Sequence, residues 1–394
     1  MTTHNEPINV VVIGGGYAGV LAANHLRINP NVAVTLINPR PEFVERIRLH
    51  QFITGSDDAV VDYAEVLADD VRLLIDTADL IDAGARIVTL GSGDIVGYDY
   101  LIYAVGSTGA ALTVPGAAEF AYPISELEHA EPLRAAMAKL HPSASVVVVG
   151  AGPTGIEVAA ELAEQDQVVT LVCGDVLGPY FSPSTRRSVT KRLRKLGVTI
   201  VEGTGAKVTE VRSDSVQLDD GRELPAVVTI WTAGFGVPDL AARSGLATDA
   251  IGRLLTDETL TSVDDPYIVA AGDASAPSDL PLRMSCQAAI PLGAQAANTV
   301  LSRISGTEPA TVNQAFTGQC VSLGRRAGVI QLAHLDDRAT RIHVGGRPAA
   351  SIKEAVCKGT ISFLAKEARK PGSYFWLRGG KRAEHLADVR VAVE

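Results

Sequence analysis

The sequence predicts an α/β protein with two Rossmann-like dinucleotide-binding domains and a small α+β region at its C-terminal end. Two observations predict this class. A short β-branched run near the N-terminus leads into a G-x-G-x-x-G motif and then into a helical pattern, and the same arrangement recurs later, with the first glycines at positions 14 and 150. The length of 394 residues is sufficient for two or three domains.

The first motif follows residues 10–13, an apolar run that is too short for a core helix and reads as a buried parallel strand. We expect Gly14 to form the turn, Gly16 to admit a pyrophosphate and Gly19 to let the following helix pack on the strand. The helix N-terminus then offers free N–H groups to the phosphates. The candidate cofactor-binding residues of this motif are Gly14, Gly15, Gly16, Tyr17, Ala18 and Gly19.

The second strand, residues 32–37, is followed by Asn38 where an acid usually holds a ribose hydroxyl. An amide can also bond a hydroxyl, so Asn38 and the nearby Arg40 are cofactor-binding candidates. Arg48 lies in a segment rich in Arg and His that either reaches a cofactor or forms a solvated helix face. Further strands are expected at residues 86–90 and 98–105, with a small-residue turn after the second. Ala78, Ala104 and Gly106 complete the candidates of this part.

The second motif begins after a strand at residues 146–149, and its candidate residues are Gly150, Gly152, Pro153, Thr154 and Gly155. Its next strand, residues 168–172, ends at Cys173. An acid there would favour NAD and a basic residue NADP, and Cys173 does neither. We expect NADH as the donor, with tolerance of NADPH. Strands are also expected within residues 197–234, with a hairpin turn at residues 219–221, before Gly234. A short strand near residue 270 ends at Gly272 and Asp273.

Composition excludes several other classes. The net charge is −10, which does not indicate nucleic-acid binding, but residues 311–394 carry 14 Lys and Arg against 7 Asp and Glu. The four cysteines lack close spacing, so we expect reduced thiols, no metal site and no local redox disulfide. No signal peptide or membrane-spanning run is visible, and a G-x-S-x-G hydrolase motif is absent. We therefore expect a cytoplasmic protein.

Taken in order, the motifs resemble the two-dinucleotide flavoprotein superfamily that includes the disulfide reductases. They are the two glycine motifs, YAVGS at residues 103–107, WTAG at 231–234 and AAGD at 270–273. The resemblance implies an FAD domain with an inserted NAD(P)H domain, and hydride transfer from NAD(P)H to the flavin. It also implies that Asp273 bonds the ribityl chain or phosphate of FAD, and that Glu157 lies close to the nicotinamide.

Within this superfamily the chain is most similar to type II NADH dehydrogenases and to the quinone reductases related to apoptosis-inducing factor. It lacks the redox cysteine pair and carries FGVPDL after WTAG and SLGRRAGVIQ at residues 322–331. The resemblance implies a quinone as acceptor, with Gln287 as a candidate at the flavin. One departure is that Pro291 and Leu292 stand where those enzymes usually have a Gln pair.

The resemblance also implies domain boundaries and leaves the acceptor open. The FAD domain is expected over residues 1–115 and 237–310, the NAD(P)H domain over 116–236 and the acceptor-facing region over 311–394. Three partners remain open for the basic, aromatic C-terminal region: the anionic inner face of a membrane, a second copy of the chain in a dimer, or the rest of the same chain. The alternatives to quinone reduction are transfer to a protein carrier such as a ferredoxin, and a redox-sensing interaction protein.

Overall fold

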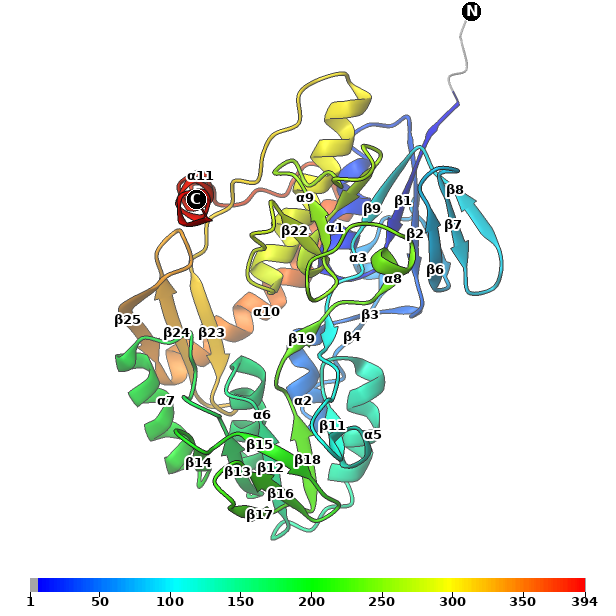
Figure 1. Cartoon of the computed structure of the whole chain (residues 1–394). Coiled ribbons are helices and arrows are strands. Elements are labelled where there is room, and N and C mark those ends of the chain that lie inside the picture. Colours follow the sequence, from blue (N-terminus) through cyan, green and yellow to red (C-terminus); the bar gives the residue numbers. More distant parts are fainter. Residues whose placement is uncertain (1–5, 394) are drawn as a thin grey trace, which may run out of the picture.

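The computed structural model describes residues 6–393, with side chains as far as residue 388. Two parallel five-stranded sheets occupy the two ends of the molecule, and a small antiparallel sheet lies beside them near the C-terminal helices (Figure 1). The predicted α/β class with two Rossmann-like sheets is thus confirmed.

The first sheet has the strand order β21-β9-β1-β2-β5, with every pair parallel. Val10, Val11 and Val12 are buried on both faces, as expected of a central parallel strand. Helices α1 and α9 pack closely, because Gly293 of α9 lies directly against the backbone of Ala18. The elements are β1 (Ile8–Ile13), α1 (Tyr17–Leu26), β2 (Val32–Asn38), β5 (Arg72–Ile75), β9 (Tyr100–Tyr103), β21 (Ile268–Ala270) and α9 (Cys286–Ile304).

Smaller elements complete this part of the chain. They form one three-stranded sheet, β6-β7-β8, two two-stranded sheets, β3-β4 and β20-β22, and several short helices. Their bounds are β3 (Glu42–Val44), η1 (Arg46–Arg48), α2 (Leu49–Ile53), β4 (Val60–Asp62), α3 (Tyr63–Val66), β6 (Ala78–Asp82), β7 (Ile87–Leu90), β8 (Ile95–Gly97), α8 (Leu240–Arg243), β20 (Leu254–Thr256), η2 (Gly272–Ala274) and β22 (Ser275–Pro277).

The second sheet repeats the first, in the order β11-β18-β12-β13-β14. The chain enters and leaves this part through β10 and β19, which pair with each other. The hairpin expected at residues 219–221 joins β16 and β17, whereas β14 and β18 belong to the parallel sheet. The elements are β10 (Thr108–Gly109), α4 (Ala117–Phe120), β11 (Ala121–Pro123), α5 (Leu127–Met137), β12 (Ser145–Val149), α6 (Pro153–Glu164), β13 (Val168–Val172), α7 (Pro183–Lys195), β14 (Thr199–Val201), β15 (Val208–Val211), β16 (Ser215–Leu218), β17 (Glu223–Pro225), β18 (Val228–Trp231) and β19 (Phe235–Gly236).

The C-terminal region forms an antiparallel sheet, β23-β24-β25, and a long helix, α10, that lies against both this sheet and α1. The buried stripe of α10 contains Cys357, Thr360, Leu364 and Glu367, spaced three or four residues apart. The elements are β23 (Gly318–Ser322), β24 (Gly328–Ala333), β25 (Ala339–Gly345), α10 (Gly346–Arg369) and α11 (Arg382–Val393). No helix in residues 6–393 is both long and apolar enough to cross a bilayer.

One hydrophobic core joins the second sheet to its neighbours. Ile156 of α6 belongs to the same buried cluster as Phe52 of α2 and Val321 of β23. Helix α6 is therefore held by the first nucleotide domain as well as by the C-terminal sheet. This arrangement fixes the position of the second glycine motif relative to the rest of the chain.

Candidate functional site

The first glycine motif forms a tight turn between β1 and α1. Gly14 has a φ of +104°, and a Cβ there would overlap the carbonyl of Ala104. A Cβ on Gly19 would overlap the carbonyl of Gly14, so this glycine lets the helix approach the strand. Around Gly16 nothing lies within 4 Å of the Cβ position. The surroundings of the three glycines therefore match their expected roles, with Gly14 in the turn, Gly16 open to a ligand and Gly19 packed against the strand. Pyrophosphate binding at Gly16 stays a prediction.

Asn38 supports this turn from the end of β2. The backbone N–H of Gly15 donates to Asn38 Oδ1 at 3.0 Å, and the hydroxyl of Tyr63 donates to the carbonyl of Gly15 at 2.8 Å. Asn38 Nδ2 donates to the carbonyl of Arg40 at 2.8 Å. The Asn38 side chain thus shapes the glycine turn directly. Ala78 begins β6 a few residues after Asp76, whose N–H donates to the carbonyl of Asn38.

The two arginine candidates join separate parts of the chain. Arg40 donates to Glu128 of α5, with Nη2 and Oε2 2.7 Å apart. Arg48 is buried and contacts Glu45, Gln51 and Glu354, with its Nη2 3.1 Å from Glu354 on α10. All three Arg48 nitrogens are therefore engaged by side chains. Both arginines thus connect segments that are far apart in the sequence, and their contact with a cofactor stays a prediction.

Asp273 lies in a buried polar group beside the glycine turn. Ser107 Oγ donates to Asp273 Oδ2 at 2.7 Å, and Arg46 Nη1 donates to the carbonyl of Ser107 at 2.7 Å. Burial lowers the pKa of Arg46, and the nearby Asp273 partly offsets that effect. Gly272, with a φ of +73°, faces Ala18 at the start of α1. Gly106, with a φ of +71°, directly precedes Ser107.

Several buried polar atoms in this region have no hydrogen-bond partner within the described residues. They include Asp273 Oδ1, Ser125 Oγ and Gln287 Oε1. Buried polar atoms are normally paired, so these three are available to a polar ligand. Gln287 is the second residue of α9, and its Nε2 donates to Thr317 Oγ1 at 2.7 Å. The open glycine turn and these atoms together fit a large polar cofactor.

The second glycine motif repeats the first turn at the start of α6. Gly150 has a φ of +131°, Gly155 packs against the carbonyl of Gly150, and the space around Gly152 is open. Pro153 begins α6, where a proline costs no helical hydrogen bond. A small hollow beside this turn is lined by residues that include Thr154, Ser125, Trp231, Gly234 and Phe235. Cys173 lies at the end of β13 and is buried.

Glu157 forms a buried ion pair with a residue that the sequence reasoning did not identify. Glu157 Oε1 is 2.9 Å from Lys353 Nζ and accepts the N–H of Ser322 at 2.9 Å. Burial raises the pKa of Glu157, but Lys353, His50 and the Ser322 N–H together bring it below its usual value. Burial likewise opposes the charge on Lys353, and Glu157 reverses that effect and raises its pKa.

His50 lies between two carboxylates on α6. Its ring nitrogens are each 3.7 Å from an oxygen, Nδ1 from Glu157 and Nε2 from Glu161. Burial lowers the pKa of His50 despite these carboxylates, since Lys353 and Arg325 also oppose its positive charge. Lys353, whose Nζ is 2.9 Å from Glu157 Oε1, is thus a closer partner of Glu157 than His50 is.

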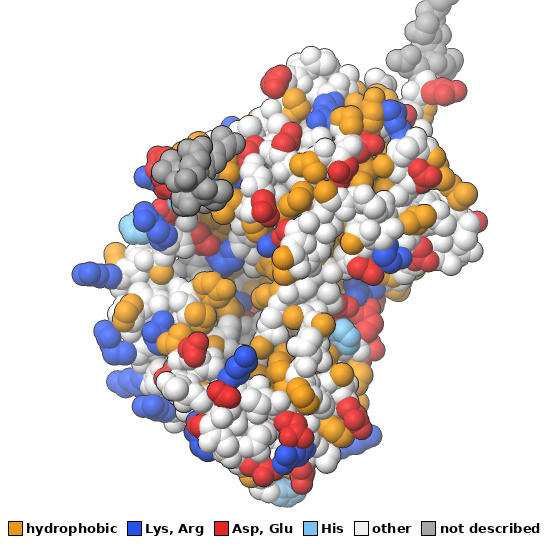
Figure 2. Space-filling model, in the orientation of Figure 1, with side chains coloured by type: hydrophobic (Ala, Val, Ile, Leu, Met, Phe, Trp, Pro, Cys, Tyr) orange, Lys and Arg blue, Asp and Glu red, His pale blue; other side chains and the backbone are white. Residues whose placement is uncertain are grey.

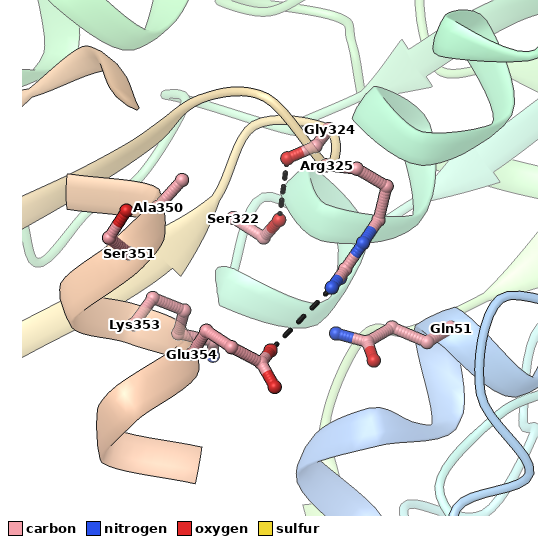
Figure 3. Close-up of a pocket in the computed structure, with 8 residues that line it drawn as sticks. All are labelled: Gln51, Ser322, Gly324, Arg325, Ala350, Ser351, Lys353 and Glu354. Carbon is pink, nitrogen blue, oxygen red and sulfur yellow. Dashed lines mark hydrogen bonds and ion pairs between the residues drawn. The ribbon is translucent and has the colours of Figure 1, made fainter. Parts of the chain in front are cut away.

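A cavity of about 360 Å³ opens beside this ion pair. Figure 3 shows Lys353 and Glu354 on α10 facing Arg325 from the β23–β24 turn, with Gln51 of α2 opposite. Arg325 also pairs with Glu161, with Nη1 and Oε1 3.1 Å apart. Each charged group of the wall thus has an ion-pair partner, and two of these partners, Glu157 and Glu161, lie outside the lining. The full lining is Gln51, Ser322, Gly324, Arg325, Ala350, Ser351, Lys353 and Glu354.

One signal in the sequence could have identified Lys353. It lies four residues before Cys357 and eleven before Leu364, on the inward stripe of α10. A lysine on a buried helix face requires a partner, and Glu157 provides it. Ser107 belongs to the YAVGS motif and Arg46 to the segment rich in Arg and His, but the contact between them joins segments 61 residues apart, which no local pattern predicts.

The chain matches the family model of the pyridine nucleotide-disulphide oxidoreductases over residues 8–297. It is 31% identical to an NADH dehydrogenase-like protein of Mycobacterium tuberculosis over 322 residues, which cover 74% of this chain and 80% of the relative. A type II NADH:quinone oxidoreductase of Staphylococcus haemolyticus is 27% identical over 357 residues, 81% of this chain and 88% of that protein. The crystal structure of the sulfide:quinone oxidoreductase from Aquifex aeolicus has the same fold. Its TM-score is 0.79 at 21% identity, over 98% of this chain and 95% of that one.

Proposed function

Because this chain belongs to the pyridine nucleotide-disulphide oxidoreductase family, we propose that it oxidises NADH and transfers the electrons to a quinone. The observation that carries the proposal is the extent of the match to a type II NADH:quinone oxidoreductase. It covers 81% of this chain, which is more than the nucleotide-binding family model alone. The free thiols Cys173, Cys286, Cys320 and Cys357 agree with an enzyme that uses no disulfide.

FAD is the cofactor of this family, and the residues around the first glycine turn fit it. Gly14 to Gly19 would face the pyrophosphate at the N-terminus of α1. Asp273 Oδ1 and Gln287 Oε1, both buried and unpaired within the described residues, would bond polar groups of the cofactor. When bound, FAD accepts hydride from NADH and supplies electrons to the acceptor.

The second glycine turn would hold the NADH pyrophosphate, with Thr154 and Gly234 lining the hollow beside it. Glu157 projects from the second turn of α6 and is kept ionised by Lys353. A carboxylate fixed in this way would orient the nicotinamide amide group through its free lone pairs. Lys353 would then act as a positioning residue, because it holds Glu157 in one orientation.

An aromatic cluster provides an apolar route to the start of α9. Phe363 packs edge-on against Tyr374, with ring centroids 5.6 Å apart, and Tyr374 stacks on Trp376 at 6.1 Å. Phe363 is 46% exposed, and the raised pKa of Tyr374, caused by burial, has a further contribution from Cys286 at the start of α9. Tyr374 and Trp376 pack against the buried cluster that includes Ala288 and Ala289, so the aromatic cluster connects the surface with the first turn of α9. We propose that a quinone reaches the cofactor along this cluster.

Anaerobic rapid mixing tests this function. NADH should bleach the yellow protein, and a short-chain quinone should restore the colour. Tyr374→Leu should leave bleaching unchanged and slow the return of colour by up to about tenfold, the worth of a lost aromatic contact. The matched control is Phe375→Leu, since Phe375 is 80% exposed and lies outside the cluster. Bleaching by NADH with no response to quinone would contradict quinone reduction and indicate a protein carrier.

We further propose that the outer face of α10 docks on an anionic membrane surface. Ile352, Val356 and Phe363 form an exposed apolar stripe, and the exposed Lys358 and Lys366 lie on the same helix. Lys and Arg side chains gather along the edge of the molecule that carries β25 and α7 (Figure 2). An apolar stripe flanked by cations is suited to an interface with anionic lipid.

Vesicle sedimentation tests the docking. The protein should bind vesicles that contain anionic lipid, release them at high salt, and ignore neutral ones. Lys358→Glu with Lys366→Glu should weaken binding by about tenfold or more. The control makes the same charge change at Lys139 and Lys207, exposed lysines of the second nucleotide domain. Equal losses in both variants, or a dimer that covers the stripe in solution, would contradict membrane docking.

A further inference from the structure

The position that usually selects between NADH and NADPH is occupied here by a thiol. Cys173 follows β13, the strand that comes after the second glycine motif and its helix, where an acid would bond the 2′-hydroxyl. Its side chain is 9% exposed, and burial, with a contribution from Glu202, raises the pKa of this thiol to about 12. Cys173 is therefore neutral at physiological pH and cannot replace a carboxylate.

A carboxylate reaches the same place from the neighbouring strand. Glu202 directly follows β14, which pairs with β13 in parallel. Its Oε2 accepts the backbone N–H of Leu177 at 2.8 Å. The N–H of Gly203 donates to the carbonyl of Gly174 and the N–H of Cys173 donates to the carbonyl of Val201, both at 2.8 Å, so the two loops are joined on both sides of Glu202. The side chain is thus held across the carboxyl end of the two strands.

The loop that Glu202 contacts is bonded directly to the glycine turn. The N–H of Gly178, the residue after Leu177, donates to the carbonyl of Ala151 at 3.0 Å. Ala151 lies between the first two glycines of the motif, and the N–H of Gly150 donates to the carbonyl of Val172 at 2.9 Å. Glu202 is therefore one short loop away from the expected pyrophosphate position. In a Rossmann domain the dinucleotide, including its adenosine ribose, binds at this carboxyl end of the strands.

The charge at this edge is negative. Glu202 and Asp175 are both exposed, and Glu202 forms no ion pair with a Lys or Arg among the described residues. Glu202 Oε2 accepts Leu177, which leaves Oε1 for another donor. A ribose with a free 2′-hydroxyl offers such a donor, whereas a 2′-phosphate would bring two further negative charges.

We propose that Glu202 is the residue that selects NADH against NADPH, by accepting a hydrogen bond from the 2′-hydroxyl and repelling a 2′-phosphate. This inference rests on the proposed use of NADH as donor. This carboxylate follows β14, whereas the fingerprint looks for an acid after β13. The residue at position 173 therefore does not indicate the preference for NADH.

The test is equilibrium binding of ADP-ribose and of its 2′-phosphate to the FAD-loaded protein by calorimetry. Wild type should bind ADP-ribose at least about 100-fold more tightly, because like charges oppose the phosphate. Glu202→Gln keeps an oxygen for Leu177, so the loop should be retained. This variant should bind ADP-ribose about tenfold more weakly and reduce the discrimination to within about tenfold.

Asp175→Asn is the matched control, because it removes one negative charge from the neighbouring loop without removing a predicted ribose hydrogen bond, and it should lower the discrimination much less than Glu202→Gln does. The inference is overturned if wild type binds the two ligands equally, if Glu202→Gln retains the discrimination, or if Asp175→Asn removes it to the same extent. Because the titration involves neither hydride transfer nor quinone, a failure of quinone turnover would leave its result intact. The two proposals can therefore fail separately.

Discussion

At the scale of single residues, the stability of the protein depends strongly on keeping both partners of the ion pair between Glu157 and Lys353. Glu157 is 6% exposed and lies 2.9 Å from Lys353. Removing one partner leaves a buried charge without its counterion, which typically costs 3–5 kcal/mol, whereas removing both is much less costly. The pair therefore makes the two substitutions strongly non-additive.

We predict that Glu157→Gln and Lys353→Met each lower the unfolding free energy by about 3 kcal/mol or more, and that the double variant recovers most of the loss. Urea unfolding of the FAD-loaded variants, followed by circular dichroism, measures this. Lys358→Met on the outer face of α10 is the control and should change stability by less than about 0.5 kcal/mol. Additive losses would mean that the two side chains do not interact in solution.

The same pair predicts how stability depends on acid. The folded-state pKa of Glu157 lies below its unfolded value, so its contribution is complete above that unfolded value of about 4.3. The contribution is lost as pH falls through the folded pKa. We predict that the difference in unfolding free energy between wild type and Glu157→Gln is constant from pH 6 to 8 and shrinks below about pH 4. A difference that grew on acidification would contradict the assignment.

The sequence predicted the turn-forming residues well because steric rules determine them. Gly14, Gly19, Gly150 and Gly155 each lack room for a Cβ, which their spacing already indicated. The partners of Arg48 and Asn38 were harder to predict, since a polar side chain bonds to whichever group the folded chain places near it. Arg48 meets Glu354, 306 residues away in the chain, and no local pattern records that distance.

At the scale of elements, two helical glycines differ in what surrounds them. Gly293 in α9 lies against the backbone of Ala18 in α1, with no room for a methyl group. Gly359 in α10 has only the ring of Phe363 near its Cβ position, at 3.9 Å. The first allows two helices to approach, whereas the second only lowers helix propensity.

We predict that Gly293→Ala destabilises the protein by about 1–3 kcal/mol and weakens FAD retention, because α9 must move away from α1. Gly359→Ala should stabilise it by about 0.5–1 kcal/mol. Thermal unfolding and the flavin content of the purified variants measure both effects. If both substitutions stabilised the protein, the close contact between α1 and α9 would be refuted.

Helix α10 shows what an element-level pattern can and cannot decide. Its apolar residues fall into two groups, and the spacing of these residues does not show which group faces the protein. Cys357, Leu364 and Ala368 are buried against the rest of the chain, whereas Ile352 and Val356 remain exposed. The buried group is set by the packing of α10 against α1 and β24, which is a tertiary contact that the helical pattern alone does not contain.

At the scale of the whole molecule, the inserted nucleotide domain is held on two sides. Its entry and exit strands pair at Thr108 and Gly236, and α6 shares a core with α2 and β23. The domains therefore form one body. We predict that saturating NAD⁺ leaves the radius of gyration unchanged within about 0.5 Å in small-angle X-ray scattering. Contraction by several ångströms would instead reveal a hinge.

The overall fold was predictable because its signals are local and repeated. Each Rossmann unit is recognisable from a strand, three glycines and a helix. The order of the motifs implied that the NAD(P)H domain is inserted into the FAD domain. The α+β character of the C-terminal region was also predicted, whereas the assembly of α2, α6 and α10 around Glu157 was not, since it depends on contacts between segments far apart in the sequence.

Two consecutive residues of α10 have different surroundings, one at the surface and one at the buried ion pair. Ile352 is exposed on the outer surface, and the next residue, Lys353, holds Glu157 beside the expected nicotinamide position. A shift of this turn of α10 would therefore couple the proposed membrane docking to the proposed binding of NADH. Such coupling is reciprocal: the factor by which a bound surface changes the affinity for NADH equals the factor by which NADH changes the affinity for that surface.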